Sequence, residues 1–320
     1  MTRVLLFGAS GFLGRAAHQA LVADSRVDEV VLAGRRPISG VVLTGRGRLD
    51  EVPWVRHDLV SDSPAQLAAL LAEVAPDAVV NCAGRLTGGY AELAAANTGA
   101  VASLVDAVAA TVPTARVVTL GSAAEYGVVT AGRPVRETDP TRPVSGYGVT
   151  RLAATRLVEL ATVTGDIDGV VLRVFNPVGP GLPEQNLAGR TILQLRRALS
   201  DGTDEIRLGP LGAYRDFVDV RDVASAVVAA VFAPRPRSVI CNVGSGTAVT
   251  ARALVRLISE AAGYTGSIVE ADPESARSAG VDWIAADLRH TASALGWAPL
   301  HSLAESAELA WAEAIAASAA

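Results

Sequence analysis

Short apolar runs rich in β-branched residues alternate with longer, alanine-rich segments of helical periodicity through the first half of the chain. The runs predict strands at Val4–Phe7, Glu29–Leu32, Trp54–Arg56, Ala78–Asn81, Arg116–Leu120 and Gly169–Val174. The segments between them predict helices at Gly11–Ala23, Ser63–Ala75, Ala91–Thr111 and Tyr147–Val163. Strands that are apolar throughout and separated by helices indicate a parallel sheet covered on both faces. We therefore expect an α/β fold with a doubly wound parallel sheet, whose ligand crevice lies at the carboxyl ends of the strands.

The pattern changes after Asn176. The run Pro177–Pro183 holds three prolines and two glycines, so it is expected to be a boundary loop that is neither helix nor central strand. Further elements are expected as helices at Leu187–Ser200 and Thr250–Ala262, a strand at Ile206–Leu208, and a helix and strand that return to the sheet at Val218–Phe232 and Val239–Asn242. We predict a sheet domain of residues 1–175, to which 216–243 return, and a smaller, discontinuous α/β domain formed mainly by 176–320.

The composition excludes several classes of protein. Half of the 320 residues are apolar and 19% are charged, which provides for a substantial core. The net charge of −5 argues against a nucleic-acid-binding surface, and no apolar run approaches the ~20 residues of a membrane helix. Glycines interrupt the apolar N-terminal stretch, so we expect no signal peptide and a cytoplasmic protein. The four histidines lack the spacing of metal ligands, so no metal site is expected, and Cys82 and Cys241 are interpreted as buried thiols.

A glycine-rich turn follows the first predicted strand and opens the first helix. Gly8 permits the tight turn, Gly11 lets the backbone approach a pyrophosphate, and Gly14 allows close packing of helix against strand. The helix N-terminus adds amide donors and a partial positive charge. In this position the pattern predicts a dinucleotide-binding (Rossmann) turn, although a turn that needs its glycines only for packing is the alternative. The predicted cofactor contacts are Gly8, Ser10, Gly11, Phe12, Leu13 and Gly14.

The second strand ends without a carboxylate. Enzymes that prefer NAD place an acid there against the ribose 2′-hydroxyl, whereas this chain has Arg35 and Arg36 after Gly34. Because arginine pairs well with a 2′-phosphate, NADP is favoured over NAD, unless both arginines only solvate a loop. Asp58 and Leu59 follow the third strand and are predicted to lie near the adenine, although Asp58 could equally cap a turn.

Ser122, Tyr147 and Arg151 form the predicted catalytic group. Ser122 lies just past the fifth strand, and Arg151 stands one helical turn after Tyr147 on the same face. A fixed cation beside a tyrosine lowers its pKa by about one to three units, which eases proton exchange near neutral pH. A nearby serine hydroxyl can bond a substrate oxygen on which charge develops. Together these groups suit the interconversion of an alcohol and a carbonyl while hydride moves to or from nicotinamide.

Several motifs in this order resemble the extended short-chain dehydrogenase/reductase family, in particular its nucleotide-sugar epimerases, dehydratases and reductases. Beyond the glycine-rich turn they are Asn81-Cys82-Ala83-Gly84, Asn97, Gly121–Gly127, Tyr147–Arg151, Arg173–Pro177, Arg215–Val220 and Leu295–Trp297. The resemblance implies further cofactor contacts at Cys82, Ala83, Gly84, Asn97, Tyr147, Arg151, Phe175, Pro177 and Val178, those of the last two through backbone. It implies substrate contacts at Ser122, Asn176, Asn186 and Arg215, with a nucleotide diphosphosugar as substrate. It also implies a homodimer built on the helices that hold Asn97 and Tyr147.

For two of the substrate contacts a simpler explanation is available. Arg215 could instead pair with Asp216 or Asp219 on the surface, and Asn186 could cap a loop.

Two departures narrow the activity. The family pattern is Tyr-x-x-x-Lys, whereas here the last position is Arg151, which keeps the charge but relays no proton. Dehydratases of the family carry acids directly after the catalytic hydroxyl, where this chain has Ala123 and Ala124; Glu125 comes one position later and is expected to point elsewhere. Dehydration is therefore disfavoured.

The segments around Ser122 and Tyr147 look most like reductases of 4-keto-6-deoxy sugar nucleotides. We therefore expect an NADPH-dependent reductase of a keto-sugar nucleotide, with Tyr147 as general acid. There are two alternatives. One is an epimerase with tightly bound NAD, and the other is a nucleotide-binding sensor whose catalysis is weakened by Arg151.

Overall fold

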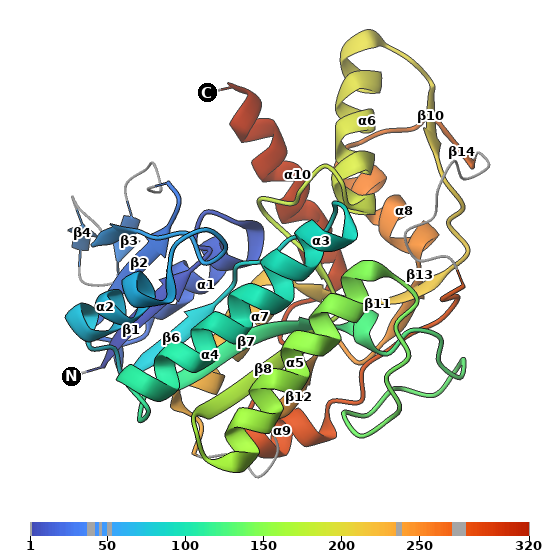
Figure 1. The fold of residues 1–320 in the computed structure, drawn as a ribbon. Coiled ribbons are helices and arrows are strands. Elements are labelled where there is room, and N and C mark those ends of the chain that lie inside the picture. Colours follow the sequence, from blue (N-terminus) through green and yellow to red (C-terminus); the bar gives the residue numbers. More distant parts are fainter. Residues whose placement is uncertain are drawn as a thin grey trace.

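The computed structural model describes residues 2–36, 42–44, 47–49, 53–234, 239–270 and 280–319. Its largest sheet has the strand order β5-β2-β1-β6-β7-β8-β12, and every neighbouring pair is parallel. This order confirms the predicted doubly wound sheet (Figure 1). Its strands are β1 (Arg3–Phe7), β2 (Glu29–Gly34), β5 (Trp54–Arg56), β6 (Ala78–Asn81), β7 (Arg116–Ser122), β8 (Asp168–Val174) and β12 (Ile240–Val243).

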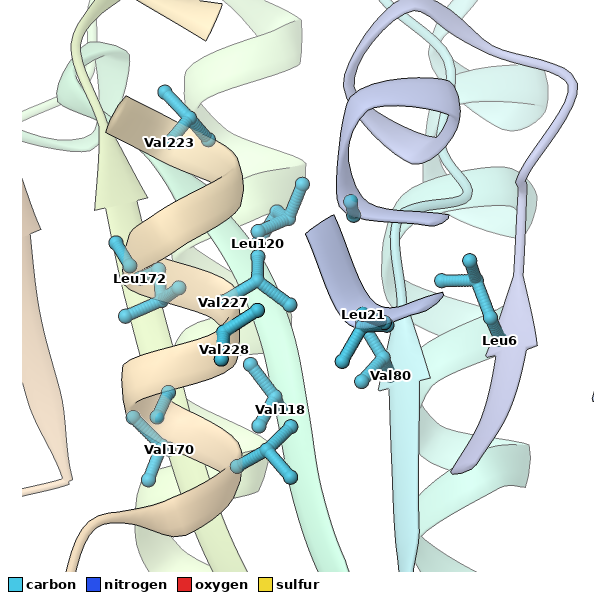
Figure 2. Close-up of a cluster of buried hydrophobic side chains, with 14 of the residues drawn as sticks. Leu6, Leu21, Val80, Val118, Leu120, Val170, Leu172, Val223, Val227 and Val228 are labelled. Carbon is cyan, nitrogen blue, oxygen red and sulfur yellow. The ribbon is translucent and has the colours of Figure 1, made fainter. Parts of the chain in front are cut away.

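Helices cover both faces of this sheet. On one face α1 (Phe12–Ala23) and α7 (Val220–Phe232) pack together, and Figure 2 shows Leu21 of α1 and Val223, Val227 and Val228 of α7 among strand side chains. On the other face lie α2 (Pro64–Val74), α4 (Ala100–Thr111) and α5 (Gly146–Thr164). The strands inside the sheet are mostly apolar because they are buried on both sides, whereas the edge strand β5 is half-buried to exposed.

One predicted helix contains an irregular segment. The stretch expected as a single helix at Ala91–Thr111 begins as α3 (Tyr90–Leu93), continues as a π-helical segment, η1 (Ala94–Gly99), and ends as α4. π-Helical segments are rare and occur frequently at functional sites. The run Tyr90–Thr111 is also long and apolar enough to cross a membrane by length and composition, and here it packs against α2 and α5.

A second layer of structure stands beyond the carboxyl ends of the strands, where Figure 1 shows α6, β10, α8 and β14 on one side of the sheet. Its core is formed by three helices together with the small strands. The helices are α6 (Leu187–Asp201), α8 (Ala251–Ala261) and α10 (Leu303–Ala319). The strands are β9 (Asn176–Val178), β10 (Glu205–Leu208), β11 (Tyr214–Asp219), β13 (Ala248–Thr250) and β14 (Ser267–Glu270).

The predicted boundary loop is wrong at its start. Pro177 lies in β9, the edge strand of a sheet of order β13-β11-β9, and an edge position tolerates a residue without an N–H. β11 belongs to this small sheet, whereas α7 and β12 join the main one, as expected for Val218–Phe232 and Val239–Asn242. The division of the chain into two domains stays a prediction. The remaining elements are the β3–β4 pair (Val42–Thr44, Gly47–Leu49), the 3-10 turn η2 (Ala123–Glu125) and α9 (Arg289–Leu295).

Candidate active site

The glycine-rich turn packs directly against the end of β6. Gly8 has a φ of 79°, and a Cβ there would lie 2.6 Å from the backbone nitrogen of Ala83. A Cβ on Gly14 would overlap the carbonyl oxygen of Gly8, so α1 can approach the turn only because this residue has no side chain. The turn therefore requires glycine at both positions, for the reasons expected from the sequence.

The N-terminus of α1 is open to a ligand. Gly11 occupies the N-cap, is exposed, and within the described chain no side chain caps the first amides of the helix. Ser10 is exposed beside it, while Phe12 and Leu13 are half-buried. Uncapped amides and the helix dipole suit a pyrophosphate, so these residues fit a dinucleotide.

One of the residues predicted to lie near the adenine, Asp58, bonds the backbone of a turn. Arg35 and Arg36 are exposed after β2. Asp58 accepts a hydrogen bond from the backbone N–H of Val60 at 3.0 Å, and its own N–H donates to Asp62 at 2.9 Å. Asp58 therefore caps a turn, which is the alternative that the sequence left open. The side chain of the following residue, Leu59, packs against the core.

Ser122 is the last residue of β7 instead of lying past it. Its Oγ accepts a hydrogen bond from the backbone N–H of Ala124 at 3.2 Å, and the side chain is half-buried at the strand end. Its backbone N–H donates to Oε1 of Glu125 at 2.8 Å. The hydroxyl thus lies at the carboxyl edge of the sheet, and the backbone of Ser122 is fixed by Glu125.

Glu125 is fully buried and supports this strand end. Its Oε1 also accepts from the hydroxyl of Thr155 on α5 at 2.9 Å, and its Oε2 accepts from Nε of Arg173 on β8 at 2.7 Å. The carboxylate points into the protein, as expected, so it is unavailable to a substrate. Sequence reasoning did not assign it this supporting role; the available signal was a charged Arg173 inside a strand that is otherwise apolar.

The buried pair extends into a polar network. Arg173 Nη1 donates to the hydroxyl of Tyr126 at 3.2 Å, and that hydroxyl donates to Oδ1 of Asn242 at 2.7 Å. Nδ2 of Asn242 donates to the carbonyl of Val135 at 3.0 Å. Burial raises the pKa of Tyr126 to about 12. Through these contacts β7, β8 and β12 hold the segment that leads to α5.

Tyr147 and Arg151 stand at the start of α5, which Ser145 caps by accepting the N–H of Gly148 at 3.1 Å. The guanidinium carbon of Arg151 lies 5.6 Å from the centroid of the Tyr147 ring. Nη1 donates to the carbonyl of Leu120 at 3.1 Å, and the residue is only 9% exposed. The structure thus brings the predicted cation beside the predicted acid.

Asn97 is enclosed by protein. It is fully buried in the π-helical segment, its Oδ1 accepts from the N–H of Arg85 at 2.8 Å, and its Nδ2 donates to the carbonyl of Arg85 at 2.9 Å and the hydroxyl of Thr150 at 3.1 Å. The predicted cofactor contact of Asn97 stays a prediction. In the structure the side chain ties the segment after β6 to α5.

The segments after β6 and β8 contain the other predicted cofactor contacts. Cys82 N–H donates to the carbonyl of Phe7 at 3.0 Å, and Ala83 N–H donates to Oδ1 of Asn81 at 2.9 Å. Burial raises the pKa of the Cys82 thiol to about 12, against the opposing charge of Arg151. The side chains of Phe175 and Val178 are buried, whereas Gly84 is exposed and Pro177 is half-buried.

The residues predicted to bind the substrate, Ser122 apart, lie in the second layer. Asn176 Nδ2 donates to the carbonyl of Asp216 at 2.9 Å. Asn186 is the N-cap of α6, yet its side chain makes no cap hydrogen bond to the described helix. Arg215 is half-buried, and burial lowers the pKa of its guanidinium, against the opposing charge of Asp282.

The surface pairing of Arg215 with Asp216 or Asp219 is not what the structure has. Arg215 Nη1 donates to the carbonyl of Tyr214 at 2.8 Å. Asp216 is fully buried and accepts from Ser245, Gly246 and Ala286. Asp219 instead pairs with Arg221 at 2.8 Å.

Among the described residues, no group of three or more His, Cys, Asp or Glu side chains could hold a metal ion. The open helix N-terminus, the hydroxyl at the end of β7 and the Tyr147–Arg151 pair instead define an α/β enzyme of the dinucleotide-binding, short-chain dehydrogenase/reductase type. The chain belongs to the NAD dependent epimerase/dehydratase family, whose model matches residues 4–244.

Its relatives include reductases of sugar nucleotides, which confirms the resemblance found in the motifs. The dTDP-6-deoxy-L-talose 4-dehydrogenase (NAD(P)(+)) of Kitasatospora kifunensis is 38% identical over 311 residues, 97% of this chain and 94% of the relative. The GDP-6-deoxy-D-mannose reductase of Pseudomonas aeruginosa is 28% identical, over 93% of this chain and 92% of that one. The structure of MoeE5 in complex with UDP-glucose and NAD superposes with a TM-score of 0.81 at 28% identity, over 100% of both chains.

Proposed function

We propose that this protein is an NADPH-dependent reductase of a dTDP-linked 4-keto-6-deoxy sugar. The observation that carries the proposal is the placement of Tyr147 and Arg151 beside the end of β7, where alanines follow Ser122 and Glu125 is buried. That site can exchange a proton with a carbinol or carbonyl oxygen, and Ala123 and Ala124 stand at the positions where dehydratases carry the acids that eliminate water. The substrate class follows the relative from Kitasatospora kifunensis, whose name specifies a 4-dehydrogenase of a dTDP-6-deoxy sugar.

Tyr147, Ser122 and Arg151 have separate roles in the proposed proton transfer. When bound, the nicotinamide supplies the hydride. Tyr147 donates its proton to the carbonyl oxygen, and Ser122 holds that oxygen by a hydrogen bond while negative charge develops on it. Arg151 keeps a positive charge beside the tyrosine and bonds the ribose hydroxyls, but it does not itself transfer the proton.

The substrate diphosphate is assigned to Arg215, with Asn186 and Asn176 on the same side of the crevice. Arg215 lies in β11 and is partly desolvated, which strengthens its attraction for an anion. Asn186 stands at the open N-terminus of α6, where amides add to the attraction. We therefore assign substrate binding to the face formed by residues 176–320.

NADP is the proposed cofactor, because Arg35 and Arg36 are exposed where NAD enzymes carry an acid. Calorimetric titration of the purified protein with NADPH and with NADH tests this directly. Tighter binding of NADPH is expected; equal or tighter binding of NADH would reject the assignment. The same titrations in Arg35→Ala and Arg36→Ala separate the two arginines.

An epimerase is the competing function, because the family includes epimerases by its description. The cofactor content of the purified protein and its consumption of NADPH discriminate between a reductase and an epimerase. A reductase exchanges its cofactor in each turnover, so the protein should be isolated free of nicotinamide and should consume NADPH in proportion to sugar. Tightly bound NAD, together with interconversion of sugar epimers without net NADPH use, would favour the epimerase.

We also propose that the protein acts in the cytoplasm as a homodimer paired through α4 and α5. The outer face of α5 exposes Leu157, Leu160 and Val163, with 62% and 76% of the last two accessible in one copy of the chain. Sedimentation should find a dimer that Leu160→Glu dissociates. A wild-type monomer at micromolar concentration would contradict this arrangement.

A further inference from the structure

Gly84 lies against the guanidinium of Arg151. It is the third residue after β6, and a Cβ built on it would overlap Nη2 of Arg151 and would lie 2.7 Å from Cζ and 3.0 Å from Nη1. The three nearest atoms to that Cβ all belong to this one group. The missing side chain at position 84 is therefore the space that the guanidinium fills.

The guanidinium is held from the opposite side as well. Nη1 donates to the carbonyl of Leu120 in β7, and Cζ is 5.6 Å from the Tyr147 ring centroid. With only 9% of Arg151 exposed, its charged end is enclosed by the ends of two neighbouring strands and by Tyr147. A methyl group at position 84 would push the cation out of this place.

We propose that Gly84 is a positioning residue that matches this site to arginine instead of lysine at position 151. A guanidinium is planar and branches at its end, whereas an ammonium is a compact point charge on an unbranched stem. An arginine therefore needs the room at Gly84 to bring its charge beside Tyr147, and a lysine needs less of it. The functional consequence rests on the role proposed above for Arg151.

Four proteins test the pairing: wild type, Gly84→Ala, Arg151→Lys and the double variant. Gly84→Ala should lower kcat/KM and weaken NADPH binding by about tenfold or more, the range expected for groups in direct contact. In the Arg151→Lys background the same methyl group should cost no more than about twofold, so the two changes are strongly non-additive. Gly89→Ala is the matched control, because among the described atoms nothing lies within 4 Å of its Cβ.

A second measurement needs neither substrate nor cofactor. The thermal unfolding midpoint of the unliganded protein should fall in Gly84→Ala and recover when Arg151→Lys is added, since only the packing of the guanidinium is involved. If this recovery occurs in a protein inactive on every sugar nucleotide, the pairing holds and the proposed function fails. Equal effects of Gly84→Ala in both backgrounds, on stability and on cofactor affinity, would overturn the pairing. Gly84 would then serve only the backbone beside the cofactor.

Discussion

At the scale of single residues, buried groups support the candidate active site. Ser122 is presented by a strand end whose backbone is bonded to Glu125, and Glu125 is neutralised by Arg173 in the interior. Burying such a pair is costly unless both partners are well bonded, and here Thr155 and Tyr126 provide further bonds. The proposed proton donor is Tyr147.

Replacing Tyr147 by phenylalanine removes the proton donor and little else. Turnover should fall by about 10²- to 10⁴-fold, the usual contribution of a general acid, while NADPH affinity and the unfolding midpoint stay close to wild type. Steady-state kinetics and calorimetry measure the two quantities. Tyr90→Phe, a change on a ring that is 81% exposed, serves as control. A Tyr147→Phe enzyme that retained more than about a tenth of wild-type kcat would show that another group is the acid.

The buried hydroxyl of Tyr126 should make the free energy of unfolding fall at alkaline pH. Its folded-state pKa of about 12 is above the value of about 10 expected in the unfolded chain, so the native state keeps this proton longer. The stability linked to it is fully present below pH 10 and is lost as pH rises to 12, by about 2–3 kcal/mol. Tyr126→Phe should be less stable at neutral pH, because hydrogen bonds are lost, but its denaturant midpoint should fall less steeply between pH 10 and 12. If the denaturant midpoints of wild type and Tyr126→Phe fell equally between pH 10 and 12, the loss of stability would not come from Tyr126.

At the scale of elements, the glycine-rich turn joins β1, α1 and β6 into one structure. Gly14→Ala would place a methyl group on the carbonyl of Gly8, so the first turn of α1 would have to move away from Gly8 and Ala9 at the end of β1. We expect a loss of about 1–3 kcal/mol in unfolding free energy and at least tenfold weaker NADPH binding. Gly99→Ala is the control, because its Cβ would meet only Ala94 O at an ordinary 3.7 Å. Similar behaviour of the two variants would contradict this account of the turn.

Elements that bury a regular face were predictable, and those stabilised by distant partners were not. β1, β6, β7 and β8 appear in the sequence as apolar runs because each is enclosed between helices. β9 contains a proline and forms only because β11, almost forty residues later, pairs with it. The π-helical segment around Asn97 likewise depends on Arg85 and Thr150, which no local pattern reveals.

In the candidate site, too, residues in a local motif were predictable, and contacts with distant partners were not. Ser122, Tyr147, Arg151 and the glycines were identified because their spacing along the chain carries the chemistry. Asn97 and Asp58 were predicted to contact the cofactor, which stays a prediction, and the sequence did not show that their side chains bond the backbone of neighbouring segments. Glu125 was correctly expected to avoid the substrate, yet its bond to the N–H of Ser122 requires a 3-10 turn that the sequence does not indicate.

At the scale of the whole molecule, the proposed site draws its residues from both layers. The sheet supplies the open α1 terminus, Ser122 and the Tyr147–Arg151 pair, whereas Asn186 and Arg215 come from the layer above it. A substrate bound between them would place its diphosphate against the second layer and its sugar against the hydroxyls. The central claim is therefore that hydride enters the sugar at a carbonyl carbon while Tyr147 protonates the oxygen.

Transfer of deuterium from NADPH labelled at nicotinamide C4 tests that claim most directly. The purified protein is incubated with the labelled cofactor, carrying deuterium on either face, and a dTDP-4-keto-6-deoxy sugar, and the product is analysed by mass spectrometry and NMR. The account predicts one deuterium per product molecule, located at sugar C4, with one NADPH oxidised for each sugar reduced and with transfer slowed by about 10²- to 10⁴-fold in Tyr147→Phe. A product that carries no deuterium from either labelled cofactor, or an epimer formed without NADPH oxidation, would contradict it.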